Sequence, residues 1–164
     1  MSEKNLHALS VRLGERLQAA SAWVTCAESC TGGLVAKSIT DIAGSSAWFD
    51  RGFVTYSNAA KHEMLGVAES TLQAHGAVSE PVVREMAFGA LKAAGADYAV
   101  SISGIAGPGG GTDAKPVGTV WFGIAAEDGR MMAIKQCFSG DREAVRMQAA
   151  VFALQTLLDE FLEK

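Results

Sequence analysis

The chain has 164 residues, a length that fits one domain with its own hydrophobic core. Apolar residues make up 49% and charged residues 20% of it, which excludes an intrinsically disordered chain. The formal charge of −4, from 14 basic and 18 acidic residues, argues against a nucleic-acid-binding domain, which is usually basic. No apolar run is long enough to span a membrane, and the charged start does not resemble a signal peptide, so we expect a cytoplasmic protein.

The first half of the chain alternates predicted helices and strands. Leucines recur at helical spacing near the start, and an apolar run, AWVTCA, follows them as a predicted buried strand. The segment RGFVTY is rich in aromatic and β-branched residues, as a strand is. The elements expected here are a helix over 4–20, a strand over 22–27, a helix over 34–40, a strand over 51–56 and a short helix over 58–65.

The second half adds helices and a predicted β-hairpin. Ser79 is expected to cap a helix that has Pro81 in its first turn and runs to about residue 94. Asp128-Gly129 is a hairpin-turn signal, and Asp141 is expected to cap a last helix ending near residue 162. The strands expected here are 98–103, 117–126 and 131–138. This order predicts a single α/β domain over residues 1–164, a three-layer αβα structure with a mixed sheet and helices on both faces.

The first candidate site is the turn ESCTGG, from Glu28 to Gly33, between a predicted strand and a predicted helix. Its hydroxyl groups on Ser29 and Thr31 and its backbone around Gly32 lie at a helix N-terminus, which is suited to binding an anion such as phosphate. The alternative is a capped helix start, in which these hydroxyls only satisfy backbone N–H groups.

The second candidate site combines Ser45 and Ser46 with Tyr56 and Lys61. A serine needs a base to become a nucleophile, and a lysine can serve if burial or a nearby positive charge, such as Arg51, lowers its pKa. A Ser/Lys/Tyr set is therefore chemically reasonable for acyl transfer. The alternative is that the serines are turn residues, the tyrosine is a strand residue and the lysine is solvated.

Two further segments are candidate ligand sites. The glycine-rich loop GIAGPGGG, with Gly104, Ala106 and Gly107, follows a predicted strand but matches neither a dinucleotide fingerprint nor a P-loop. Arg142 and Arg146 share one face of the last predicted helix and could hold a phosphate or carboxylate. The alternatives are a tight connection for the loop and surface ion pairs for the arginines. We predict no metal site, because the spacing of Cys26 and Cys30 lacks the further ligands of a zinc site and favours buried thiols.

Six segments in order resemble the CinA C-terminal domain family, and most closely its stand-alone nicotinamide-nucleotide amidases. They are AESCTGG, GSSAWFDRGFVTYSNAAK, GAVSE, SISGIAGPGGG, KPVGTVWFG and FSGDREAVR, and together they cover essentially the whole chain. The resemblance implies hydrolysis of the carboxamide of nicotinamide mononucleotide to the acid mononucleotide and ammonia, in pyridine nucleotide salvage, without metal or cofactor. It also implies an αβα domain that forms dimers or higher oligomers.

The resemblance places the family's serine, tyrosine and lysine at Ser46, Tyr56 and Lys61, and its first-motif serine at Ser29. We expect Lys61 to deprotonate Ser46, backbone N–H groups near Ser45 and Ser46 to stabilise the oxyanion, and Ser29 to support the lysine or to be the rival nucleophile. The substrate is expected to contact the residues named above: Thr31, Gly32, Ser45, Gly104, Ala106, Gly107 and either Arg142 or Arg146. Three alternatives remain: a catalytically silent pyridine-nucleotide-binding protein, a competence or DNA-damage accessory protein, and an amidase for another small amide.

Overall fold

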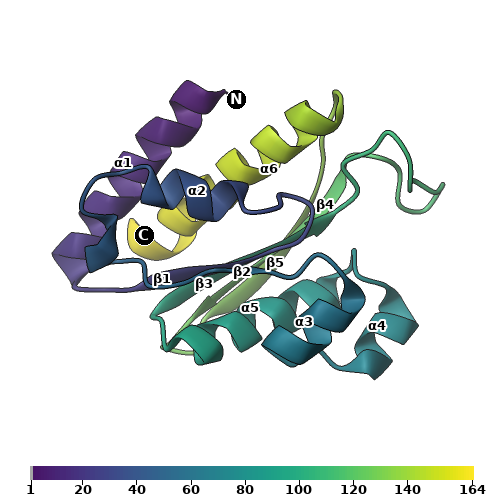
Figure 1. Ribbon diagram of the computed structural model, residues 1–164, viewed down its shortest axis with the longest axis horizontal. Coiled ribbons are helices and arrows are strands. Elements are labelled where there is room, and N and C mark those ends of the chain that lie inside the picture. Colours follow the sequence, from purple (N-terminus) through teal and green to yellow (C-terminus); the bar gives the residue numbers. More distant parts are fainter. Residues whose placement is uncertain (1) are drawn as a thin grey trace.

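The computed structural model of the chain describes residues 2–164 and shows an α/β domain with one central sheet (Figure 1). The sheet has five strands in the order β2-β1-β3-β4-β5. β2, β1 and β3 are parallel, whereas β4 and β5 run antiparallel to their neighbours. The strands are β1 (Val24–Glu28), β2 (Phe53–Val54), β3 (Tyr98–Gly104), β4 (Thr119–Ala126) and β5 (Met131–Cys137). The predicted mixed sheet is therefore confirmed.

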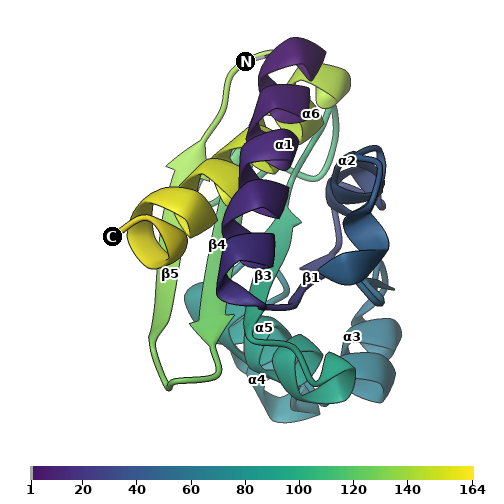
Figure 2. The ribbon, with the colours of Figure 1, turned by 90° about the vertical axis from the view of Figure 1, so that its left-hand side faces the viewer.

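Helices cover both faces of this sheet, as the sequence predicts (Figures 1 and 2). One face carries α1 (Glu3–Ala20), α2 (Leu34–Thr40) and α6 (Arg142–Leu157). The other carries α3 (Asn58–Leu65), α4 (Glu69–His75) and α5 (Glu80–Ala94). Each face has its own apolar core, because the buried strands present side chains alternately to the two helical layers. None of the helices described is long and apolar enough to cross a membrane.

Most predicted elements are confirmed, and the differences have local causes. The strand expected over 51–56 is reduced to two residues, which pair with Ala27 and Glu28 at the sheet edge. α4 was not predicted, since Leu72 is its only buried residue and gives no helical periodicity. The last helix ends at Leu157 and continues as a π-helical turn, Leu158–Leu162. Ser79 begins α5, but its hydroxyl donates to the carbonyl of Gly76 at 2.7 Å instead of capping the helix.

One crossing of helices is unusually close. A Cβ built on Gly89 of α5 would lie 1.9 Å from the carbonyl oxygen of Leu65 in α3. Only glycine can occupy this position without a shift of one helix, because a contact that short is strongly repulsive. The crossing sets the height of α3 above the sheet, and α3 also carries Lys61.

Candidate active site

Lys61 is a buried amine at the C-terminal edge of the parallel strands. It lies on α3, which begins where the Ser57 hydroxyl accepts a hydrogen bond from the Ala60 amide at 3.0 Å. The side chain is only 1% exposed. Its Nζ lies 2.9 Å from the Thr55 carbonyl oxygen, 3.1 Å from the Tyr56 carbonyl oxygen and 3.0 Å from the Ser29 hydroxyl. These contacts use all of the hydrogen-bonding capacity of a lysine amine.

Ser29 meets this amine because it follows β1 directly. Its amide donates to the carbonyl of Ile102 in β3 at 3.0 Å, so the sheet ladder extends to the serine and fixes its backbone. The side chain is 8% exposed. A hydroxyl in contact with a desolvated amine is the arrangement that general-base activation of a nucleophile requires. Within residues 2–164, the next amide N–H groups, those of Cys30 and Thr31, make no hydrogen bond to another residue.

Burial sets the protonation of the two groups nearest to Ser29. It lowers the pKa of Lys61 to about 8, with a smaller opposing influence from the Cys30 thiol. Burial also raises the pKa of Cys30 to about 11, although the charges on Arg146 and Lys61 act in the opposite direction. Lys61 is therefore partly neutral near physiological pH, whereas Cys30 stays a thiol and is no competitor of the serine. Cys26 is also a buried free thiol, as the sequence predicts.

The positive charge expected to help lower the pKa of Lys61 is not supplied by Arg51. Arg51 is exposed and ion-paired with Asp50. Its carbonyl accepts from the hydroxyl of Thr25, which lies near the start of β1. The lysine is perturbed by its burial instead.

Tyr56, Arg142 and the glycine-rich loop meet beside the Ser29–Lys61 pair. One guanidinium nitrogen of Arg142 lies 3.2 Å from the Tyr56 hydroxyl, and another donates to the Gly107 carbonyl at 2.9 Å. Tyr56 is 61% exposed, and its backbone carbonyl contacts Lys61. The structure thus gathers Ser29, Tyr56, Lys61 and Arg142 from three separate segments of the chain. It leaves N–H donors of Arg142 free for a ligand.

The anion site predicted at the start of α2 is already occupied by the protein itself. The buried carboxylate of Glu28 accepts hydrogen bonds from the amides of Gly33, Val35 and Ala36 at 3.2, 2.9 and 2.9 Å. It also accepts a 2.6 Å hydrogen bond from the Thr31 hydroxyl. The hydroxyl of Thr31, a residue predicted to contact substrate, is fully buried and bonded to Glu28, so only the backbone of this residue remains available to a ligand. The free amide N–H groups at the start of α2 are therefore hydrogen-bonded to Glu28 and not available to an external anion.

The Arg146 side chain is also hydrogen-bonded within the protein. Its guanidinium donates to the carbonyls of Cys30 and Thr31 at 3.0 and 3.2 Å. A Cβ built on Gly32 would lie 2.8 Å from this guanidinium, so the exposed glycine allows its close approach. Of the two arginines predicted to contact substrate, Arg142 lies with Tyr56, and Arg146 braces the turn around Ser29.

The structure does not bring Ser46 next to Lys61 within the chain. Ser46 is exposed in a short 3-10 helix, Ser45–Ala47. The carbonyl of Trp48, just after it, accepts from the amide of Val24 at the beginning of β1. Ser29 lies beyond the other end of that strand, which spans roughly 15 Å at about 3.3 Å per residue. Ser45 lies in the same 3-10 helix as Ser46, so neither residue supplies an N–H group to an oxyanion next to Lys61.

The glycine-rich loop between β3 and β4 contributes less through its first residues than predicted. Gly104 is part of β3, and a Cβ there would lie 2.8 Å from the Thr119 carbonyl, so the glycine serves strand pairing. Ala106 is buried in the core. Gly107 has a φ of +82° and offers its carbonyl to Arg142. The loop then extends beyond the end of the sheet (Figure 1).

Sequence reasoning missed two contributors to this site. Glu28 belongs to the turn ESCTGG, and a carboxylate at the end of an apolar strand is the signal of a buried, hydrogen-bonded charge. Thr55 acts through its carbonyl oxygen, for which the sequence carries no signal. Its own hydroxyl is buried without a hydrogen-bond partner among the residues described.

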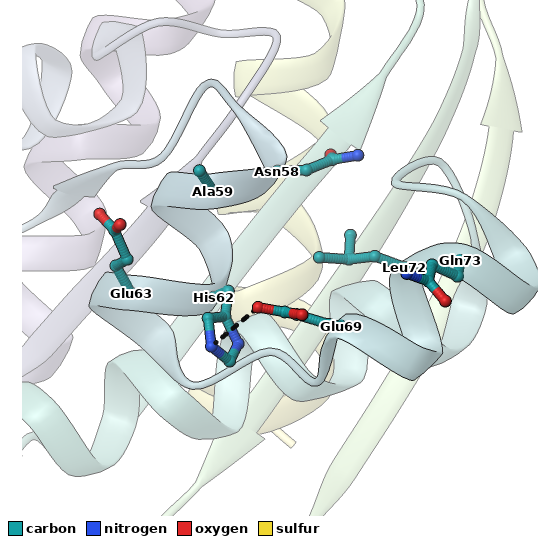
Figure 3. A pocket seen from close by; sticks show the side chains of 7 residues that line it. All are labelled: Asn58, Ala59, His62, Glu63, Glu69, Leu72 and Gln73. Atoms are coloured by element: carbon teal, nitrogen blue, oxygen red, sulfur yellow. Dashed lines mark ion pairs between the residues drawn. The ribbon is translucent and has the colours of Figure 1, made fainter.

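A separate pocket of about 390 Å³ lies between α3 and α4 (Figure 3). His62, the neighbour of Lys61, points into it, with Nδ1 2.8 Å from the Val67 carbonyl and Nε2 3.4 Å from the Glu69 carboxylate. None of its lining residues is a hydrogen-bond partner of Ser29 or Lys61. Among residues 2–164, no cluster of His, Cys, Asp and Glu could hold a metal ion.

Comparison with known proteins identifies close relatives along the whole chain. The CinA C-terminal domain family matches residues 6–161. The chain is 74% identical over 163 residues to a protein of Enterobacter agglomerans and 66% identical over 163 residues to one of Escherichia coli K12, with 99% of each chain covered. Both relatives are named nicotinamide-nucleotide amidohydrolase PncC. A solved competence/damage inducible protein from Agrobacterium tumefaciens has a TM-score of 0.92 at 43% identity, covering 94% of both chains.

Proposed function

The chain belongs to the CinA C-terminal domain family, and from this premise we propose that it hydrolyses the carboxamide of nicotinamide mononucleotide to nicotinate mononucleotide and ammonia. The observation that carries the proposal is the 3.0 Å contact between the Ser29 hydroxyl and the buried amine of Lys61. An activated hydroxyl is the chemistry that cleavage of an unactivated amide needs. The names of the two full-length relatives support the choice of substrate.

The carbonyl oxygens of Thr55 and Tyr56 orient the base. When Lys61 is neutral, its two N–H bonds point to these oxygens, so its lone pair is directed at the Ser29 hydroxyl. Lys61 then accepts the hydroxyl proton as Ser29 Oγ bonds to the carboxamide carbon. The resulting ammonium returns this proton to the amide nitrogen, the C–N bond breaks, and ammonia leaves an acyl-serine. Water, deprotonated by the neutral lysine, hydrolyses that ester and regenerates Ser29.

The charge that develops on the carboxamide oxygen is assigned to the free amide N–H groups of Cys30 and Thr31. They follow the nucleophile directly, as oxyanion donors do in other acyl-transfer enzymes. Each such donor contributes about 3–4 kcal/mol to transition-state stabilisation in enzymes where it has been removed. Arg146 supports this role because it fixes the carbonyl groups of the same two residues.

The other end of the substrate is assigned to Arg142. Its guanidinium is exposed at the first turn of α6, and its contacts with Tyr56 and Gly107 hold it in place. The free donors can bind the phosphate, and the Tyr56 hydroxyl orients Arg142 through their contact. A cytoplasmic, oligomeric enzyme of pyridine nucleotide salvage is part of this proposal and is supported by the family resemblance.

The proposal is tested by ammonia release from nicotinamide mononucleotide, with nicotinamide riboside and nicotinamide as comparison substrates. We expect turnover by the unmodified protein and a loss of about 10³-fold or more in kcat for Ser29→Ala. Ser46→Ala serves as the matched serine control and should stay within about twofold of the unmodified protein. Binding of the mononucleotide without ammonia release would favour a catalytically silent binding protein. Loss of turnover in Ser46→Ala alone would reverse the two serines.

A further inference from the structure

Glu28 is a fully buried carboxylate next to Ser29 that the proposed reaction does not use. One oxygen accepts from the Thr31 hydroxyl and from the Gly33 and Val35 amides, at 2.6, 3.2 and 2.9 Å. The other accepts from the Ala36 amide at 2.9 Å, with the Cys26 thiol at 3.6 Å. A buried carboxylate is costly unless its lone pairs are satisfied, and these contacts satisfy them. Among residues 2–164 no lysine or arginine forms an ion pair with it, so the charge rests on N–H dipoles at the start of α2.

These hydrogen bonds join three parts of the chain whose relative positions determine where Ser29 lies. Glu28 is the last residue of β1, Thr31 lies in the turn after Ser29, and Gly33 to Ala36 begin α2. The carboxylate therefore fixes both ends of the turn that carries the nucleophile. A neutral carboxamide could not reproduce this arrangement, because its NH₂ group would face the amide N–H of Val35 or Ala36.

Arg146 holds the opposite side of the same turn. It donates to the carbonyls of Cys30 and Thr31, whereas Glu28 accepts from the hydroxyl of Thr31. Thr31 is therefore hydrogen-bonded at its hydroxyl to Glu28 of β1 and at its carbonyl to Arg146 of α6. The turn has little freedom to move while both contacts are intact.

We infer that Glu28 is a positioning residue that, acting through Thr31 and the start of α2, holds Ser29 within reach of Lys61 and aims the Cys30 and Thr31 amides at the oxyanion. The inference rests on the proposed function, in which Ser29 is the nucleophile. Its energetic basis is the steep distance dependence of a reacting pair, since a misplacement of about 1 Å can lower a rate about 10²-fold.

The test compares Glu28→Gln with Asp41→Asn, which makes the same carboxylate-to-carboxamide change at the exposed far end of α2. The rate of Ser29 labelling by a fluorophosphonate is measured by mass spectrometry across pH, alongside kcat, KM and Tm. In the labelling, a serine–phosphorus bond forms, fluoride leaves and Lys61 takes the proton. We expect Glu28→Gln to lower labelling and kcat about 10–100-fold with KM within about threefold, and to shift the pH midpoint upward as water reaches Lys61. Asp41→Asn should match the unmodified protein.

A merely structural role would give a different result. Glu28→Gln would then lower Tm and the fraction of protein that can be labelled, but the folded fraction would keep the normal rate and pH midpoint, and this would overturn the inference. If Glu28→Gln does not fold, Thr31→Val takes its place, since it removes only the hydroxyl donor. It should show the same loss of rate, and Thr31→Ser should recover most of it.

The failure of the proposed function can be told apart from the failure of this inference. If the unmodified protein is not labelled at Ser29, the serine is not an activated nucleophile and both fail. If Ser29 is labelled in the unmodified protein and equally fast in Glu28→Gln or Thr31→Val, only the positioning role is overturned.

Discussion

The Nζ of Lys61 lies 3.0 Å from the Oγ of Ser29, although 32 residues separate them in the chain. Ser29 directly follows β1, whereas Lys61 lies on α3, a helix that packs on one face of the sheet. The pair therefore depends on the sheet and on the helix that packs over it.

The rate of the reaction should rise with pH through the pKa of Lys61. Burial lowers that pKa to about 8, and only the neutral amine can accept a proton from Ser29. We expect kcat/KM to climb about tenfold per pH unit below this value and to level off above it. The measurement is a pH profile of ammonia release, with Lys61→Arg as the control, because a guanidinium stays protonated throughout. A midpoint near the ordinary lysine value of about 10.4 would argue against Lys61 as the base.

Replacement of Arg142 by glutamine should weaken substrate binding more than turnover. A lost hydrogen bond to a charged group costs about 1.5–3 kcal/mol, which corresponds to an increase in KM of roughly 10–150-fold. Nicotinamide riboside, which lacks the phosphate, should show little change, so KM is measured for both substrates. Arg84→Gln, a surface arginine paired with Glu80 on α5, is the matched control. An equal effect on both substrates would mean that Arg142 does not bind phosphate.

Gly89→Ala should impair both folding stability and catalysis. The added methyl group would lie 1.9 Å from the Leu65 carbonyl, so α3 must move by about 1 Å or more and take Lys61 with it. We expect a loss of about 1–3 kcal/mol in the free energy of unfolding and a fall of about 10²-fold in kcat. Urea unfolding and ammonia release measure the two effects. Ala93→Ser, on the exposed side of the same helix, should change neither, and a fully active Gly89→Ala would show that the crossing does not position the lysine.

Thr55→Val should leave the protein as stable as before or more stable. The Thr55 hydroxyl is buried without a partner among residues 2–164, and an unsatisfied buried polar group costs about 1–3 kcal/mol. Valine has the same shape without this polar atom, and the backbone carbonyl that contacts Lys61 remains. Urea unfolding gives the comparison. A loss of more than about 1 kcal/mol would instead indicate that a bound water satisfies the hydroxyl.

Local patterns in the sequence predict most of the fold. The spacing of Leu6, Leu9, Leu13 and Leu17 predicts α1, because these residues form one buried face. Asp141 caps α6 as expected, accepting from the amide of Ala144 at 2.9 Å. The weakly periodic α4 and the short edge strand β2 depend on tertiary contacts, and no local pattern indicates their bounds.

The site was only partly predictable, because which serine lies next to Lys61 depends on the pairing of strands far apart in the chain. The family resemblance favours Ser46 as the partner of Lys61, and the spacing of the residues does not decide between the two serines. The topology contains a corrective signal: Ser46 precedes β2, whereas Ser29 and Thr55 each follow a parallel strand. Residues that follow parallel strands share one edge of the sheet, where α/β proteins bind ligands. Which carbonyls Lys61 contacts could not be read from side-chain identities at all.

The brevity of β2 has a consequence for the sheet as a whole. An unpaired outer strand invites another chain to add to it, and proteins commonly protect such borders with a lysine or with a very short strand. Here the border strand has two residues, and the carbonyls of Thr55 and Tyr56 just beyond it are engaged by Lys61. A border strand of two residues offers another chain few free backbone groups with which to pair.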